Sequence, residues 1–193
     1  MSDILNGVDR QLLFDTVDAV KADSGVAAFK FKVKNRWVDG AENRSTVDDY
    51  YGAHEELRYT PAFELVNDEP PKLLGRDSTP NPVEYVLHGL AGCLTTSMVY
   101  HAAAQGIEIT SVETRFEGDL DLRGFLGLNE NVRNGFDEIR VVFDIQGNFE
   151  HEVKQDLIAI AQRFSPVLDI VSNGVPVTCR LADAHRNPEA TAA

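Results

Sequence analysis

The chain has 193 residues, a length that fits one domain with a hydrophobic core that needs no disulfide or metal support. Its 43% hydrophobic and 25% charged residues exclude a disordered or fibrous protein. Thirty-one acidic against 18 basic residues give a net charge of −13, which repels phosphate backbones and anionic lipids. We therefore expect no nucleic acid and no membrane among its partners.

The N-terminal residues and the cysteine usage predict a cytoplasmic protein. Residues 1–6 have no basic segment followed by an apolar run, so they do not resemble a signal peptide. No stretch of 18 apolar residues occurs, and the two cysteines are too few for a disulfide scaffold.

The first segment predicts a helical extension over residues 1–25. Apolar residues recur near a 3.6-residue period between positions 4 and 20, and Asp23-Ser24-Gly25 ends the pattern. We expect this amphipathic helix to cover a sheet face or to extend a dimer.

Strand signals follow the predicted helix. Residues 29–37 alternate between apolar side chains and lysines, and Asp39-Gly40 favours a hairpin that returns over residues 44–51. A third strand is expected over 62–66. Turn-forming residues then fill positions 68–82.

The strongest helical pattern covers residues 82–104. Pro82 suits a first helical turn, and Glu84 lies where a carboxylate favours the helix dipole. The rest of the segment is apolar or small all round, which predicts a buried central helix ended by Gln105-Gly106.

The remaining pattern completes an α+β fold. It predicts strands over 107–121 and 138–146, a helix over 150–163, a short helix opened by Ser165-Pro166 and a strand over 175–181. We expect antiparallel sheets wrapped around buried helices, and a flexible tail over residues 183–193.

Several kinds of chemistry lack a motif. The five histidines have no metal-binding spacing, which favours partly exposed helix residues and no metal: His54, His88, His101, His151 and His185. No phosphate-binding glycine loop and no nucleophile elbow of a serine hydrolase is present.

Cys93 is the first candidate for a reactive group. It lies mid-helix among small residues, where a cysteine most often packs as a small hydrophobe. A nearby cation would change that reading, because the thiolate is the reactive form. Arg44 and Arg76 precede the helix and could reach the sulfur, and Glu84 at the helix start could orient such an arginine.

Cys179 carries the second thiol. It alternates with Val175, Val177 and Leu181 in the predicted last strand, so we expect it on an apolar face in the core. Nothing in the sequence pairs it with Cys93.

Three segments together resemble the OsmC/Ohr family of osmotically induced and organic-hydroperoxide-resistance proteins. They are residues 81–93 (NPVEYVLHGLAGC), 120–128 (LDLRGFLGL) and 164–167 (FSPV). The resemblance covers residues 26–182 and is to an OsmC-like branch without the second cysteine. It implies an intertwined homodimer with sites at the dimer interface.

The resemblance also implies roles for single residues. Cys93 matches the reactive position, and Arg44 in the early hairpin is the better match to the family's arginine, with Arg36 second. Two positions depart from the family pattern. Ser165 stands where the family has its resolving cysteine, and Val83 stands where it has a glutamate, with Glu84 one residue later.

Two functions follow from these matches. The first is thiol-dependent reduction of organic hydroperoxides by Cys93, with Arg44 and Glu84 in the site, no bound cofactor and an external thiol as reductant. The second is an OsmC-like protein that binds an apolar small molecule without peroxidase activity, in which Cys93 is structural.

Overall fold

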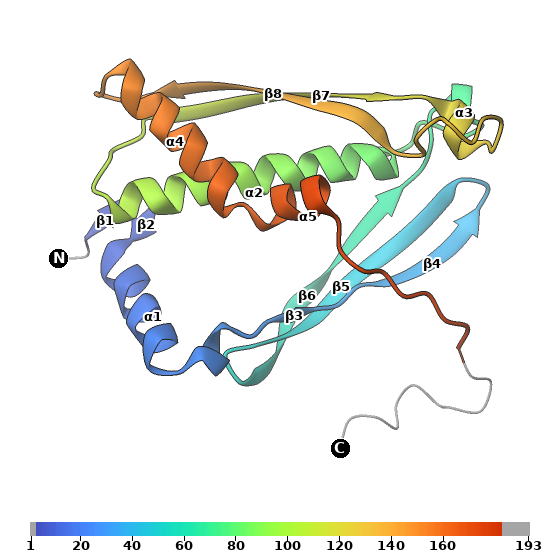
Figure 1. Ribbon diagram of the computed structural model, residues 1–193. Helices are drawn as coiled ribbons and strands as arrows, with labels where there is room; N and C mark the ends of the chain where they lie inside the picture. The colour runs from blue at the N-terminus through green and yellow to red at the C-terminus, as the bar shows by residue number, and fades with distance from the viewer. Residues whose placement is uncertain (1–2, 183–193) are drawn as a thin grey trace.

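The computed structural model describes residues 3–182, which form two separate antiparallel sheets and a small hairpin around one long helix (Figure 1). In chain order the elements are β1 (Ile4–Leu5), β2 (Val8–Asp9), α1 (Arg10–Ala22), η1 (Ser24–Ala27), β3 (Lys30–Phe31), β4 (Lys34–Asp39), β5 (Glu42–Gly52), β6 (Glu55–Asn67), η2 (Pro71–Leu73), α2 (Pro82–Ala104), β7 (Ser111–Leu120), α3 (Leu122–Phe125), β8 (Phe136–Gln146), α4 (His151–Phe164) and α5 (Pro166–Asn173). The α+β class with antiparallel sheets is as predicted.

The N-terminal segment corrects the prediction of one helix over 4–20. β1 and β2 form a short hairpin whose turn, Asn6-Gly7, has positive φ at both residues, and α1 begins only at Arg10. Asn6 also bonds the segment between α2 and β7: its amide donates to the Ile107 carbonyl at 2.9 Å, and its Oδ1 accepts from the Ile109 N–H at 2.8 Å. The hairpin therefore anchors α1 beside the C-terminal end of α2.

The first large sheet contains β3, β4, β5 and β6. β5 pairs with β3 and β4 along one edge and with β6 along the other. The predicted strand 29–37 is split into β3 and β4, and the strand expected over 62–66 is the end of the much longer β6. Figure 1 shows this sheet on the opposite side of α2 from β7 and β8.

The core lies along one side of α2. Leu90, Leu94, Met98 and Ala102 form a buried stripe at helical spacing, and it packs against α4, α5 and the inner face of β8. The bounds of α2 match the predicted helix over 82–104, since Asn81 caps it and Pro82 occupies its first turn. Its other side is not buried by residues 3–182.

The last predicted strand is absent from the described residues. Residues 174–182 are irregular and exposed, with Leu181 at 96%. Cys179 is exposed too, so the expectation that it packs in the core is wrong for this chain. A backbone with alternating side chains becomes a strand only beside another strand, and within residues 3–182 this segment pairs with no strand.

Two further expectations concern the ends and the membrane. The flexible tail predicted over 183–193 lies outside the described residues. Among residues 3–182, no helix is long and apolar enough to cross a bilayer.

Candidate functional site

Cys93 lies in the middle of α2, beside its buried stripe. The side chain is half-buried; Gly89, four residues earlier, is adjacent on the helix surface, and Gly92 directly precedes it in the chain. A methyl group built on either glycine would meet no neighbouring element within 4 Å. This side of α2 is therefore open at the level of the sulfur. Within residues 3–182 the sulfur makes no hydrogen bond.

Arg44 lies on β5 and is held by two carboxylates. Its Nε and Nη2 both donate to Glu42 Oε1 at 3.1 Å, and its Nη1 donates to Glu64 Oε1 at 3.2 Å. Arg36, the second candidate, lies directly opposite Arg44 on β4. No hydrogen bond or ion pair joins Arg44 to Cys93 among the described residues.

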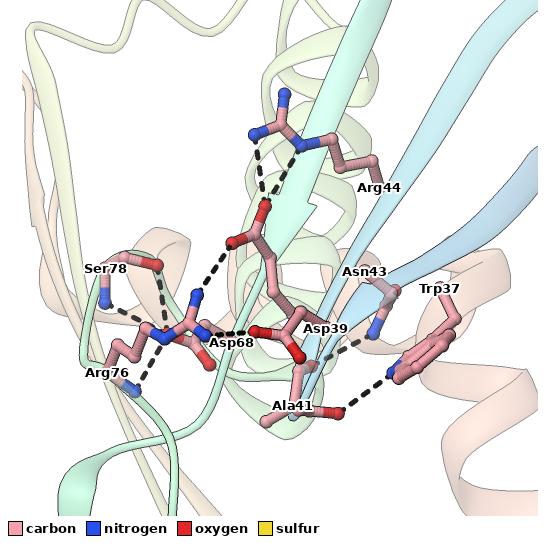
Figure 2. A network of polar contacts seen from close by, with 10 residues as sticks. Trp37, Asp39, Ala41, Asn43, Arg44, Asp68, Arg76 and Ser78 are labelled. Atoms are coloured by element: carbon pink, nitrogen blue, oxygen red, sulfur yellow. Dashed lines mark hydrogen bonds and ion pairs between the residues drawn. The ribbon is translucent and has the colours of Figure 1, made fainter.

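Arg76 joins this hairpin to the loop before α2 (Figure 2). Its guanidinium bonds Asp39 at the β4–β5 turn and lies 3.9 Å from Glu42 Oε2. Glu42 thus contacts both arginines, Arg44 through one oxygen and Arg76 through the other. This carboxylate was not among the sequence candidates, and its position two residues before Arg44 on one strand face is the only local signal for it.

The buried Asp68 side chain bonds the same loop. It is buried, and its Oδ2 accepts from the Arg76 backbone N–H at 3.0 Å and from Ser78 Oγ at 3.0 Å. Backbone N–H bonds, from Glu69 first and then from Arg76, lower the pKa of Asp68 below its ordinary value. A charged Asp68 therefore fixes the loop in which Arg76 lies.

Glu84 caps α2. Its carboxylate accepts from the Asn81 backbone N–H at 2.8 Å, and Asn81 Oδ1 accepts in turn from the Glu84 N–H at 2.8 Å. It bonds neither Arg44 nor Cys93 in the described part of the chain. Glu84 and Cys93 thus lie at the start and in the middle of α2, and Arg44 lies on β5, with no direct bond among the three within residues 3–182.

A cavity of about 380 Å³ opens at the N-terminal end of α2. It is lined by Pro80, Glu84, Tyr85 and His88. Tyr85 fixes one wall by donating from its hydroxyl to the Val66 carbonyl at 2.8 Å. Glu69, in the preceding loop, has a raised pKa because it is partly buried and lies near the charges of Asp68 and Glu84.

Ser165, at the position where the resemblance implies a resolving cysteine, caps a helix. It is buried at the start of α5, and its Oγ accepts from the Leu168 N–H at 3.2 Å as the N-cap. Within residues 3–182, no group of three histidine, cysteine or acidic side chains is placed to hold a metal ion.

Comparisons with known proteins place this fold. A family model described as OsmC-like protein matches residues 75–180, while no curated protein matches the chain. Among solved structures, an OsmC-like protein from Mycoplasma pneumoniae has a TM-score of 0.59 at 16% identity, covering 74% of this chain and 87% of its own. An OsmC-like protein of unknown function from Vibrio cholerae has a TM-score of 0.51 at 12% identity, with 72% and 92% covered.

A third structure is an organic hydroperoxide resistance protein, OsmC, from Legionella pneumophila. It has a TM-score of 0.49 at 17% identity and covers 75% of this chain and 91% of its own. At these identities the first two structures, with TM-scores above 0.5, speak for the fold alone. The family match spans more than half of the 193 residues and includes α2 with its cysteine, so the chain belongs to the OsmC-like protein family.

Proposed function

We propose that the protein reduces organic hydroperoxides with the Cys93 thiol, as part of a defence against oxidative stress. The observation that carries the proposal is the position of Cys93 within the family-matched helix, half-buried on a side that this chain leaves open. Apolar helix surface around it suits an organic peroxide better than hydrogen peroxide.

The chemistry needs one cysteine and an external thiol. The Cys93 thiolate attacks the distal oxygen of the hydroperoxide, an S–O bond forms as the O–O bond breaks, and the leaving alkoxide takes a proton to become the alcohol. The sulfur is thereby oxidised to a sulfenic acid. A first external thiol converts it to a mixed disulfide and water, and a second restores the Cys93 thiol and leaves with the first as a disulfide.

Arg44 and Glu84 are the proposed partners of Cys93. A guanidinium beside the sulfur favours the thiolate and stabilises the negative charge that develops on the leaving oxygen. In one chain Arg44 is bound to Glu42 and Glu64 instead, so the proposal includes a second copy that completes the site.

A row of exposed and half-buried aromatic residues supports such a homodimer. Phe29, Phe31, Tyr50, Tyr59 and Phe63 form a continuous row on the first sheet, with successive ring centroids 4.9 to 5.9 Å apart. Phe31 is 73% exposed and Phe63 is 55% exposed. An apolar row of this size on a single chain is typical of a protein interface.

Consumption of cumene hydroperoxide with dithiothreitol tests the activity. We expect the wild type and Cys179→Ala to consume the peroxide at similar rates, and Cys93→Ala to show only the uncatalysed rate. Equal rates for the wild type and Cys93→Ala would exclude the proposed reaction.

The alternative function is binding of an apolar small molecule without peroxide chemistry. Two observations favour it: Ser165 caps α5 and cannot form a disulfide, and Glu84 is used as a helix cap. The rate of Cys93 alkylation against pH, measured in Cys179→Ala, separates the two. A half-maximal rate near pH ~8.5, as for an ordinary cysteine, favours binding, and a clearly lower midpoint favours the peroxidase.

A further inference from the structure

The guanidinium of Arg44 is held in a fixed direction by two carboxylates. Its Nε and Nη2 donate to a single oxygen, Glu42 Oε1, at 3.1 Å, and its Nη1 donates to Glu64 Oε1 at 3.2 Å. A guanidinium has five N–H groups, so these three bonds leave one N–H on each Nη without a partner among residues 3–182. The carboxylates therefore orient Arg44 and leave two of its donors for another group.

Glu42 is in turn held by a second arginine. The Glu42 side chain is only 16% exposed, and its Oε2 lies 3.9 Å from Nη1 of Arg76 (Figure 2). The Arg76 guanidinium also bonds Asp39, at the turn between β4 and β5. Arg76 thus attaches the carboxylate that orients Arg44 to the loop before α2.

The loop gives Arg76 a defined position. The buried Asp68 carboxylate accepts from the Arg76 backbone N–H at 3.0 Å and from Ser78 Oγ at 3.0 Å. The same loop leads into α2, the helix that contains Cys93. The start of this helix and the Arg44 guanidinium are therefore connected through the side chains of Arg76 and Glu42.

The charges around Arg44 balance only when Arg76 is included. The groups that face Arg44 come from its own strand, from both neighbouring strands and from the loop: Glu42, Arg36, Glu64 and Arg76. Together with Arg44 itself and with Asp39, which bonds Arg76, these side chains carry equal positive and negative charge. Removing the charge of Arg76 would leave a net negative charge, which disfavours a thiolate beside Arg44.

We propose that Arg76 is a positioning residue for Arg44 and acts on it through Glu42. Arg76 holds the carboxylate that orients Arg44, and it offsets the negative charge of that carboxylate. Arg44 then keeps both its direction and its favourable effect on a nearby thiolate. In this role Arg76 contacts neither the sulfur nor the peroxide. The inference rests on the proposed function, in which Arg44 lies beside Cys93 in the assembled protein.

The pH dependence of Cys93 alkylation, measured in a Cys179→Ala background, tests this role. Arg76→Gln removes the positive charge beside Glu42, so we expect the midpoint of the alkylation rate to rise by about half a pH unit or more. Arg76→Lys keeps the charge without the planar guanidinium and should reverse most of that shift. Lys21→Gln removes an equal charge from an exposed side chain on α1, and it should leave the midpoint unchanged.

Glu42→Gln separates the charge from the structure. Its amide oxygen can still accept from Nε and Nη2 of Arg44, but the negative charge is gone. We therefore expect the midpoint to fall, which is opposite to the effect of Arg76→Gln. A general disturbance of the loop and the hairpin would instead raise the midpoint in both variants, because either change would move Arg44 away from the sulfur.

Peroxide reduction gives a second readout of the same quantity. The acidic limb of kcat/KM against pH reports the ionisation of the essential group in the free enzyme. We expect each variant to move this limb in the same direction as its alkylation midpoint. A limb that stays in place while the alkylation midpoint moves would contradict a role of Arg76 in the reaction.

Failure of this inference is distinguishable from failure of the proposed function. A wild-type alkylation midpoint near ~8.5, as for an ordinary cysteine, would contradict the proposed function itself. In a wild type with a clearly lower midpoint, the role of Arg76 is overturned if Arg76→Gln leaves the midpoint unchanged or if Lys21→Gln raises it equally. It is also overturned if Arg76→Lys shifts the midpoint as far as Arg76→Gln, or if Glu42→Gln does not lower it.

Discussion

Asp68 and Glu69 are neighbours in sequence, yet their surroundings act on their carboxyl groups in opposite directions. Backbone N–H groups bond Asp68 and favour its charged form, which lowers its pKa. Burial and the nearby charges of Asp68 and Glu84 disfavour the charged form of Glu69, which raises its pKa. Its buried Oε2 has no hydrogen-bond partner among the described residues. The loop that leads into α2 therefore contains one stabilising and one destabilising charge at neutral pH.

This contrast predicts opposite effects of two amide substitutions on the free energy of unfolding. Asp68→Asn should destabilise the protein at pH 7, and the loss should shrink as the pH falls below about 3.8, where the folded-state advantage of the charged form disappears. Glu69→Gln should stabilise the protein at pH 7, because the folded state then no longer holds a disfavoured charge. That gain should vanish below about pH 4.5, where the unfolded carboxyl also keeps its proton.

Urea unfolding at pH 7, 4 and 3 measures both effects, and each variant is the control for the other. They change adjacent residues by the same chemical step, so a general effect of removing a charge from this acidic chain would shift both in the same direction. Shifts of the same sign at pH 7 would show that the assigned surroundings are wrong.

At the scale of the secondary-structure elements, the β5–β6 hairpin has an unfavourable turn. Ala53 and His54 both have positive φ, +50° and +67°, the left-handed region that two-residue hairpins require and that asparagine and glycine prefer. At His54 the cost of the left-handed conformation is offset by a 3.0 Å contact between its Nε2 and Oδ2 of Asp23, at the start of η1. Ala53 makes no such contact in the described chain.

Ala53→Gly should therefore stabilise the protein by about 1 kcal/mol, the usual cost of a left-handed residue with a Cβ atom, reduced in part by the greater freedom of glycine when unfolded. Ala28→Gly is the matched control, since Ala28 has a φ of −81° and gains nothing from glycine. We expect that variant to lose about 0.5 kcal/mol or more. A lower urea midpoint for Ala53→Gly than for the wild type would contradict the argument.

The elements that the sequence predicted well are those that local patterns determine. The helix over 82–104 matched α2 because its cap, its proline and its apolar residues all lie within the segment. The helix over 4–20 was wrong at its start, where Asn6-Gly7 is a hairpin signal that the apolar period concealed. The strand over 175–181 depends on a partner strand, and no local pattern supplies one.

The candidate site divides in the same way. Cys93 and Glu84 are located by the helix motif, and the cap made by Glu84 could have been predicted from Asn81 three residues earlier. The partners of Arg44 could not have been predicted from the sequence. Glu64 reaches it only through the register of β5 with β6, and Arg76 reaches Glu42 only through the folding of the loop before α2.

At the scale of the whole molecule, the two faces of the β3–β6 sheet differ in character. The aromatic row ends at Phe63, which is opposite Val47 on β5, while Arg44, Thr46 and Glu64 project from the other face. A single chain leaves both faces in solvent. In the single chain, the arginine and the carboxylates of the charged face already pair with each other. Covering the aromatic face with another surface would instead be favourable, because it removes apolar area from water.

If a second copy provides that cover, a charge on the aromatic face should separate the dimer, and a charge on the exposed side of α4 should not. Phe63→Asp removes an apolar ring and buries a carboxylate without a partner, and two-fold symmetry counts the change twice. We expect a loss of about 3 kcal/mol or more in dimerisation free energy, or roughly a hundredfold in Kd. Gln155→Asp, on the exposed side of α4, should leave the Kd within about twofold of the wild type.

Sedimentation velocity over a dilution series measures the dimer Kd of both variants. Urea unfolding of the monomer checks that neither variant loses its dimer by unfolding. Phe63 is already exposed in the single chain, so Phe63→Asp should unfold at the same urea concentration as a diluted, monomeric wild type. If Phe63→Asp left the copies together, or if Gln155→Asp separated them equally well, the aromatic face would not be the interface. Loss of peroxide reduction together with loss of the dimer, in Phe63→Asp alone, is the result expected if the second copy completes the site around Cys93.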